Sequence, residues 1–138
     1  MRYFATLLVP ILAATTFVGC GSDDPVVDVP TQSTPVSVTE TFSGTLTVNG
    51  AQTHRFQVDR AGTVSAQLKT LSADAVTLGV SLGTWNGAAC QIIISNTAAV
   101  LNTTVTGTAQ TAGQFCVWLN DVGKLTSGVD YSVEVVHF

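Results

Sequence analysis

The chain has 138 residues, of which only 10% are charged, with five basic side chains, nine acidic ones and a formal net charge of −4. So few basic residues exclude the cationic patch that nucleic acids and anionic lipid surfaces require. Once an export segment is removed, the length allows one domain. Abundant Thr, Ser, Val, Ala and Gly favour a small β-rich domain that works outside the cytoplasm.

The first segment has the pattern of a secretory signal peptide. Arg2 supplies the positive charge, and residues 3–18 are uncharged and mostly apolar. This run is shorter than the ~20 apolar residues that cross a bilayer comfortably, and Pro10 interrupts it. The sequence therefore predicts that residues 1–19 are a signal peptide and not a permanent transmembrane helix.

Cys20 ends this segment, in the sequence Phe17-Val18-Gly19-Cys20. The four residues resemble a bacterial lipobox, whose cysteine receives a diacylglycerol and becomes the mature, acylated N-terminus. The resemblance implies a lipoprotein that carries fatty acids such as palmitate on Cys20 and is held at the membrane by them. The alternative is an ordinary cleaved signal peptide with a free cysteine nearby.

Residues 20–38 are expected to form the lipidated cysteine and a disordered linker. Pro25, Pro30 and Pro35 favour extended chain and remove backbone donors, which suits a spacer between membrane and domain. No Asp follows Cys20 directly, and this resembles the sorting pattern of lipoproteins of the bacterial outer membrane. The predicted location is therefore the cell envelope, at the outer membrane.

Residues 39–138 alternate between apolar and polar side chains and carry frequent turn signals, without an amphipathic helix of useful length. This pattern predicts an all-β domain, an antiparallel β-sandwich of about eight strands, with a small closed barrel as the alternative. Asn49-Gly50 lies between two alternating runs and predicts a tight hairpin there. Strands are expected near residues 42–48, 53–58, 64–69, 76–82, 91–95, 100–106, 114–120 and 131–137.

The three cysteines are Cys20, Cys90 and Cys116, an odd number for an exported chain. If Cys20 carries lipid, Cys90 and Cys116 remain and can form a disulfide in an oxidising compartment. The alternative is two reduced, buried thiols. Two distant cysteines and two isolated histidines do not make a closed zinc site, so neither a metal nor a cofactor is predicted.

Motifs of catalysis are absent from the sequence: it has no Gly-x-Ser-x-Gly elbow and no His-Glu-x-x-His. His54 and His137 fall in expected strands, where they are predicted to be partly buried and hydrogen-bonded by neighbours. The chain is therefore predicted not to be an enzyme. A small hydrolase is the alternative, and it requires a pocket that unites one histidine with a carboxylate.

Two tryptophans flank the cysteines. Phe115, Val117 and Leu119 form a core-facing stripe, so Cys116 and Trp118 share the opposite face. A Cys90–Cys116 disulfide would draw Trp85 toward Trp118. We expect both tryptophans to cover the disulfide or to close the end of the core. The candidate ligand site, as the alternative, is an outward aromatic platform for sugar rings, made of Trp85 and Trp118, with hydrogen bonds from Asn86 or Asn120.

Three stretches resemble the bacterial pre-peptidase C-terminal domain: residues 56–64 (FQVDRAGTV), 112–119 (AGQFCVWL) and 131–135 (YSVEV). The resemblance implies a β-sandwich that accompanies a secreted enzyme and assists substrate binding or secretion. Some members of this family bind calcium. This chain departs from the family because it has no catalytic domain and its acidic residues do not form a calcium loop.

The combined interpretation is a lipid-anchored envelope protein with a non-catalytic binding or interaction module. Its expected partners are the membrane, through the lipid, and a polysaccharide or an envelope protein, with no nucleic acid. The alternative function is a structural or assembly partner in an envelope complex. That alternative predicts a large exposed apolar patch or an unpaired edge strand.

Overall fold

The computed structural model describes residues 34–73 and 75–138. The predictions of a signal peptide, of lipid on Cys20 and of most of the linker lie outside these residues. The described part contains strands and no helix, so it holds no helix long and apolar enough to cross a membrane.

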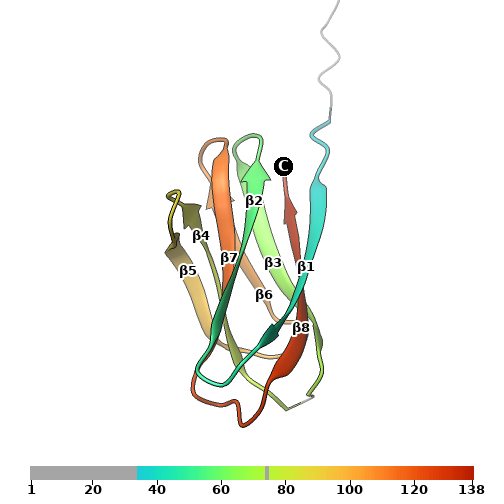
Figure 1. Cartoon of the computed structure of the whole chain (residues 1–138). Coiled ribbons are helices and arrows are strands. Elements are labelled where there is room, and N and C mark those ends of the chain that lie inside the picture. Colours follow the sequence, from blue (N-terminus) through green and yellow to red (C-terminus); the bar gives the residue numbers. More distant parts are fainter. Residues whose placement is uncertain (1–33, 74) are drawn as a thin grey trace, which may run out of the picture. The chain divides into compact units, whose positions relative to one another are not determined.

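Eight strands form two four-stranded antiparallel sheets (Figure 1). The first sheet has the order β1-β8-β3-β6, and the second has the order β2-β7-β4-β5. The predicted antiparallel sandwich of about eight strands is confirmed, and because the two sheets stay separate, the barrel alternative is not formed. The strands are β1 (Val38–Leu46), β2 (Ala51–Val58), β3 (Gly62–Leu71), β4 (Leu78–Trp85), β5 (Cys90–Ala99), β6 (Thr104–Ala109), β7 (Gly113–Asp121) and β8 (Val129–His137).

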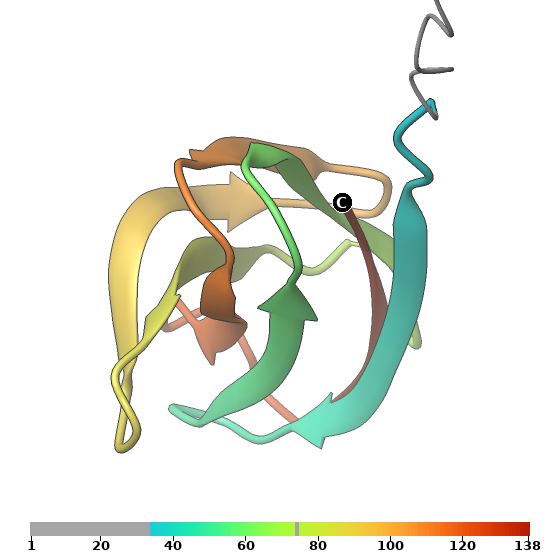
Figure 2. The ribbon, with the colours of Figure 1, turned by 90° about the horizontal axis from the view of Figure 1, so that it is seen from above.

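Seven connections join the strands, and six of them cross from one sheet to the other. Only β4 and β5 are consecutive strands that pair as a hairpin. This strand order is that of a jelly roll, in which two Greek keys are wrapped into a sandwich. The view from above shows the two layers enclosing the core (Figure 2). One side of the sandwich is bounded by edge strands β1 and β2, and the other by edge strands β5 and β6.

The hairpin predicted at Asn49-Gly50 is wrong, although a tight turn does form there. The amide of Gly50 donates to the carbonyl of Thr47 at 2.9 Å, and Asn49 has a positive φ of 57°. The strands on either side do not pair with each other, because β1 pairs with β8 and β2 pairs with β7. The turn is an arch between sheets. Local sequence encodes a reversal of the chain, whereas burial of both apolar faces decides which strands pair.

The core lies between the sheets and is aliphatic, with Phe56 and Tyr131 as its buried aromatic residues. Alternation along the strands places these residues inward, as in β8, where buried positions alternate with exposed or partly buried ones from Val129 to His137. Some predicted strand limits are displaced. Trp85 belongs to β4 and does not break it, while β6 begins at Thr104, four residues later than expected.

Candidate functional site

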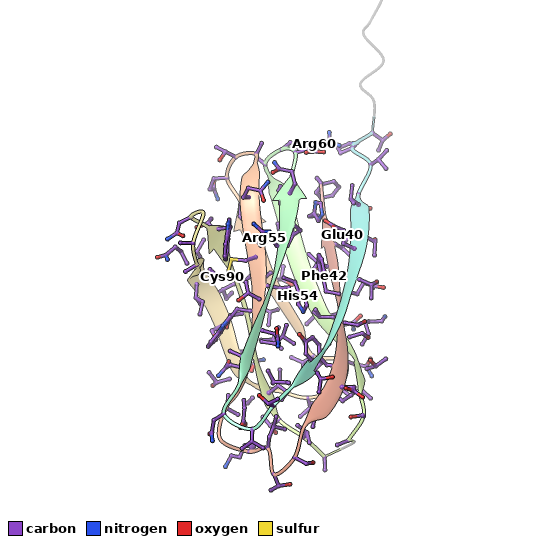
Figure 3. All side chains as sticks on the ribbon, viewed as in Figure 1. Glu40, Phe42, His54, Arg55, Arg60 and Cys90 are labelled. Carbon is purple, nitrogen blue, oxygen red and sulfur yellow. A yellow bond between two sulfur atoms is a disulfide. The ribbon has the colours of Figure 1, made fainter. Side chains whose placement is uncertain are left out.

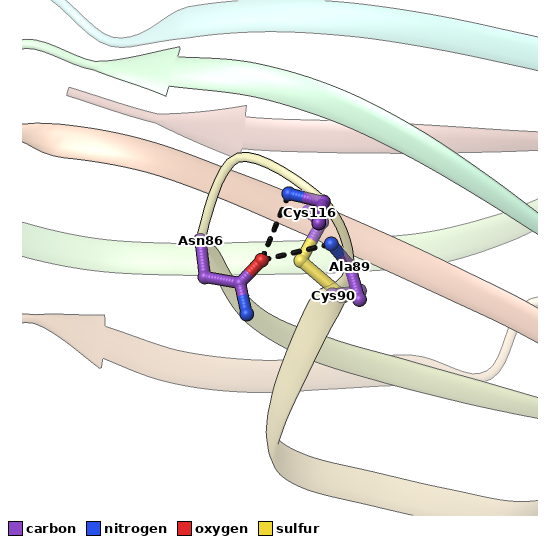
Figure 4. Close-up of a disulfide and its surroundings, with 5 residues drawn as sticks. Asn86, Ala89, Cys90 and Cys116 are labelled. Atoms are coloured by element: carbon purple, nitrogen blue, oxygen red, sulfur yellow. Dashed lines mark hydrogen bonds between the residues drawn. A yellow bond between two sulfur atoms is a disulfide. The ribbon is translucent and has the colours of Figure 1, made fainter.

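A disulfide joins Cys90, the first residue of β5, to Cys116 in β7, as predicted (Figure 4). This disulfide bond passes over β4, the strand between β5 and β7. In β4, Gly83 pairs with Cys116 of β7 and with Ile92 of β5. A side chain at Gly83 would overlap the backbone carbonyl of Gln91, so the start of β5 lies directly over this glycine. The β4–β5 hairpin thus folds onto the outer face of its own sheet and is fixed there by the disulfide.

The hairpin turn is organised by Asn86. Its Oδ1 accepts hydrogen bonds from the amides of Ala88 at 2.9 Å and Ala89 at 2.8 Å (Figure 4). Gly87 has a φ of 98°, a conformation that favours glycine. Asn86 was predicted to bind a ligand, but its acceptor oxygen is used by the loop itself. Only its amide nitrogen remains for a ligand.

Both tryptophans lie on the outer face of the second sheet and are partly buried. Trp118 pairs with Ser81 in β4, and Trp85 pairs with Cys90 in β5. The guanidinium of Arg55 lies 5.1 Å from the centre of the Trp85 ring. Since Arg55 pairs with Cys116, this cation reaches over the disulfide strand to the indole. One face of Trp85 is therefore covered by Arg55, which reduces the aromatic area left for a sugar ring.

The predicted second hydrogen-bonding residue, Asn120, does not join this cluster. Its side-chain amide donates to the carbonyl of Asp121 at 3.1 Å. It also lies against Gly79, where a Cβ would overlap the Asn120 side chain. Asn120 therefore serves local packing at the far end of β7, away from Trp85.

A polar groove lies on the side of the sandwich bounded by β1 and β2, where Figure 3 shows Glu40, Phe42 and His54. Its volume is about 550 Å³, and it is lined by Glu40, Phe42, Thr53, His54, Arg55, Phe56, Gln57 and Gln114. Arg55 contributes to this groove and also covers Trp85. The groove and the outer aromatic cluster therefore share one cation.

His54 is hydrogen-bonded by its neighbours, as predicted. Its Nε2 lies 2.7 Å from Oη of Tyr131, and its ring stacks on Phe42 with centroids 5.1 Å apart. Burial lowers the pKa of His54 and raises the pKa of Tyr131 to about 12. At neutral pH the imidazole is then neutral and the phenol protonated, and the tautomer of the ring decides which of the two groups donates. Tyr131 reaches this position because Gly44 opposite leaves room for its hydroxyl.

His137 is 3% exposed, and its Nε2 lies 2.9 Å from Oε1 of Glu40. The ring stacks against Phe56, and its buried Nδ1 has no hydrogen-bond partner. This pair does unite a histidine with a carboxylate, as the hydrolase alternative requires. However, among the described residues no serine, threonine or cysteine side chain hydrogen-bonds to either histidine. The pair therefore lacks a partner that it could activate as a nucleophile.

The opposite side of the sandwich, bounded by β5 and β6, exposes three consecutive isoleucines. Ile92, Ile93 and Ile94 in edge strand β5 are 47%, 70% and 39% exposed, and we call these three residues the isoleucine edge. In β5 an extra residue, Ile93, stands between the partners of Leu82 and Gly83. This irregularity interrupts the regular alternation of buried and exposed side chains at Ile93.

Sequence reasoning recognised residues 91–95 as a short apolar strand but not as a surface. The missed signal is charge: residues 75–120 contain no Asp, Glu, Lys or Arg. Strands β4, β5 and β6 consequently carry no charged side chain. Edge strands usually carry charges that prevent pairing with other chains, so an uncharged, exposed and apolar edge is unusual.

No protein-family model and no curated protein matches the chain. Among solved structures, a mitogen from Yersinia pseudotuberculosis superposes with a TM-score of 0.59 at 15% identity, covering 75% of this chain and 88% of that one. A periplasmic inhibitor of g-type lysozyme from Aeromonas hydrophila superposes with a TM-score of 0.50 at 12% identity, covering 70% and 83%. At these identities the likeness establishes a shared fold.

Proposed function

We propose that this chain is a lipid-anchored protein of the bacterial envelope that acts without catalysis, by binding another protein through its isoleucine edge. The exposure of Ile92, Ile93 and Ile94 on an uncharged edge strand is the observation that carries the proposal. An edge strand offers unpaired backbone donors and acceptors, and an incoming strand can add to the sheet through them. Exposed apolar side chains then supply the buried area.

The aromatic face gives weaker support to a sugar ligand. Trp85 and Trp118 are both partly buried, and Arg55 lies over Trp85. Exposure of the two tryptophans was the feature expected to favour glycan binding. An unpaired edge strand was the feature expected to favour an assembly partner, and this is the one that the fold presents.

The location rests on the N-terminal sequence, with support from the domain. The Cys90–Cys116 disulfide suits an oxidising compartment outside the cytoplasm. The same fold occurs in a periplasmic lysozyme inhibitor and in a mitogen, two proteins whose names describe actions on other molecules. Cys20 supplies the anchor in this proposal, and membership of the pre-peptidase C-terminal family remains part of it.

The test is affinity purification of the tagged, membrane-attached full chain, with mass spectrometry of its N-terminus and of the proteins that accompany it. The wild type is compared with Ile93→Lys and with a matched control, Val38→Lys. Val38 is 43% exposed and lies on edge strand β1, on the other side of the sandwich. The proposal predicts that Ile93→Lys loses specific partners that Val38→Lys retains. Identical sets of partners in all three samples, from a chain that is itself monomeric, would contradict it.

Glycan binding is the second candidate, favoured by the position of Arg55 between Trp85 and the polar groove. Its test is the double substitution Trp85→Ala/Trp118→Ala in a polysaccharide pull-down. Reduced retention on one glycan would support this candidate. Unchanged retention on every glycan tested would remove it.

A further inference from the structure

We propose that the isoleucine edge of one chain pairs with the same edge of a second copy, giving a two-fold symmetric dimer across β5. This inference rests on the proposed function, because it names the partner that the edge receives.

The backbone of β5 has no neighbouring strand on one side, and the isoleucine edge lies before the Ala98 amide, which donates to Oδ1 of Asn96. β5 is the last strand of the second sheet and pairs only with β4. Its start is held by the Cys90–Cys116 disulfide, and its end is held by pairing between Ala99 and Leu78. A strand fixed at both ends loses little conformational freedom when another strand pairs with it, and this favours association.

The charges select a second copy as the partner. The sequence after Cys20 holds four basic and nine acidic residues, so two copies repel each other over most of their surfaces. Every charged side chain of the domain lies outside residues 75–120. The β5 side is therefore where two copies can meet without bringing like charges together. A charged protein partner would find no oppositely charged side chain on β5.

Symmetry limits the assembly to two copies. When two identical strands pair in antiparallel fashion about a two-fold axis, both copies use the same surface. If residue i of one copy faces residue j of the other, residue j of the first copy also faces residue i of the second. A pairing centred on Ile93 places the isoleucines of the two copies opposite one another. Each copy then uses its β5 edge completely, so the contact closes and does not propagate into a fibre.

The first measurement is site-specific cross-linking of the full chain in its membrane. Ile93→Cys and the control Thr41→Cys, on an exposed position of β1, are treated with a short bismaleimide. The reagent requires free thiols, so the native disulfide does not react, and the wild type shows any background from Cys20. The dimer predicts a cross-linked species of twice the mass for Ile93→Cys alone. Equal yields at both positions, or none at position 93, would overturn it.

The second measurement is sedimentation of the full chain in mild detergent, with Ile93→Lys and Val38→Lys as variants. Two lysines that face each other across the axis should weaken dimerisation by at least about tenfold, because like charges directly opposite destabilise strand pairing. Val38→Lys should dimerise like the wild type. Thermal unfolding of each variant verifies that the domain is folded.

The results separate this inference from the proposed function. A monomeric wild type whose Ile93→Lys variant loses an identified protein partner would overturn the dimer and leave the proposed function standing. A wild type that is monomeric and has the same partners as Ile93→Lys would contradict both. A dimer dispersed by Ile93→Lys supports both.

Discussion

Removal of the disulfide provides the most quantitative prediction about this fold. The double variant Cys90→Ala/Cys116→Ala opens a loop whose ends are 26 residues apart in sequence. In the chain-entropy model, a cross-link over a loop of this length restricts the unfolded chain by about 3.5 kcal/mol at 25 °C. For a domain of this size, that loss should lower the midpoint of thermal unfolding by roughly 15 °C.

Circular dichroism during heating measures this effect, with the reduced wild type as a control. The reduced wild type keeps both sulfur atoms, including that of buried Cys116, so it separates loss of the cross-link from loss of packing around Cys116. Alanine is chosen because a serine at buried Cys116 would leave a hydroxyl without a partner. A loss of stability below about 1 kcal/mol would refute the reasoning, since the disulfide would then contribute less than a third of its predicted effect.

Four further predictions concern the packing at Gly83, the titration of His54, the titration of Tyr131 and the processing of the N-terminus. Gly83→Ala should lower the free energy of unfolding by at least about 2 kcal/mol, because its methyl group would meet the backbone of Gln91. The control is Gly107→Ala, whose methyl group would be 3.6 Å from its nearest neighbour and should have little effect. Equal losses of stability in urea titrations of the two variants would contradict this. Burial lowers the pKa of His54, so the folded chain binds that proton less readily than the unfolded chain, and stability from this group should be full above about pH 6.5 and fall as the pH decreases below it. The free energy of unfolding of the wild type minus that of His54→Gln, measured at each pH, isolates this contribution and should decrease as the pH falls. An increase of this difference at low pH would contradict the assignment. Tyr131, with its pKa raised to about 12, should cause a separate loss of stability as the pH rises above about 10. Intact-mass analysis of membrane-extracted protein should show residues 1–19 removed and acyl groups on Cys20, while an unmodified sulfur would end the lipoprotein hypothesis.

The sandwich could be predicted from sequence because alternation reports which face of each strand is buried. The pairing of strands could not be, as Asn49-Gly50 shows. A positive φ at Asn49 and a tight turn are local properties, whereas β1 and β2 pair with β8 and β7, and the paired residues are between 55 (Val58 and Gly113) and 99 (Val38 and His137) positions apart in sequence. The Asn-Gly signal therefore predicted the reversal correctly and the hairpin wrongly.

Some features of the candidate sites could likewise be predicted from the sequence, and others could not. The pairing of Cys90 with Cys116 follows from counting thiols. The outward position of Trp118 follows from alternation, because Trp118 and core-facing Phe115 occupy opposite faces of the strand. The stacking of Arg55 on Trp85 does not, because it joins strands β2 and β4 across an intervening strand. Exposure of the isoleucine edge also depends on knowing that β5 ends its sheet. Its lack of charge, by contrast, was readable from the sequence.

The central claim is that the isoleucine edge is the surface through which this protein contacts another protein. The most direct test is a photo-reactive amino acid placed at position 93 of the full chain in living cells, with position 41 as the control. The account predicts a discrete higher-mass adduct from position 93, whether with a second copy or with another protein, and none from position 41. Irradiation that produces no adduct at position 93, or the same adducts at both positions, would contradict it.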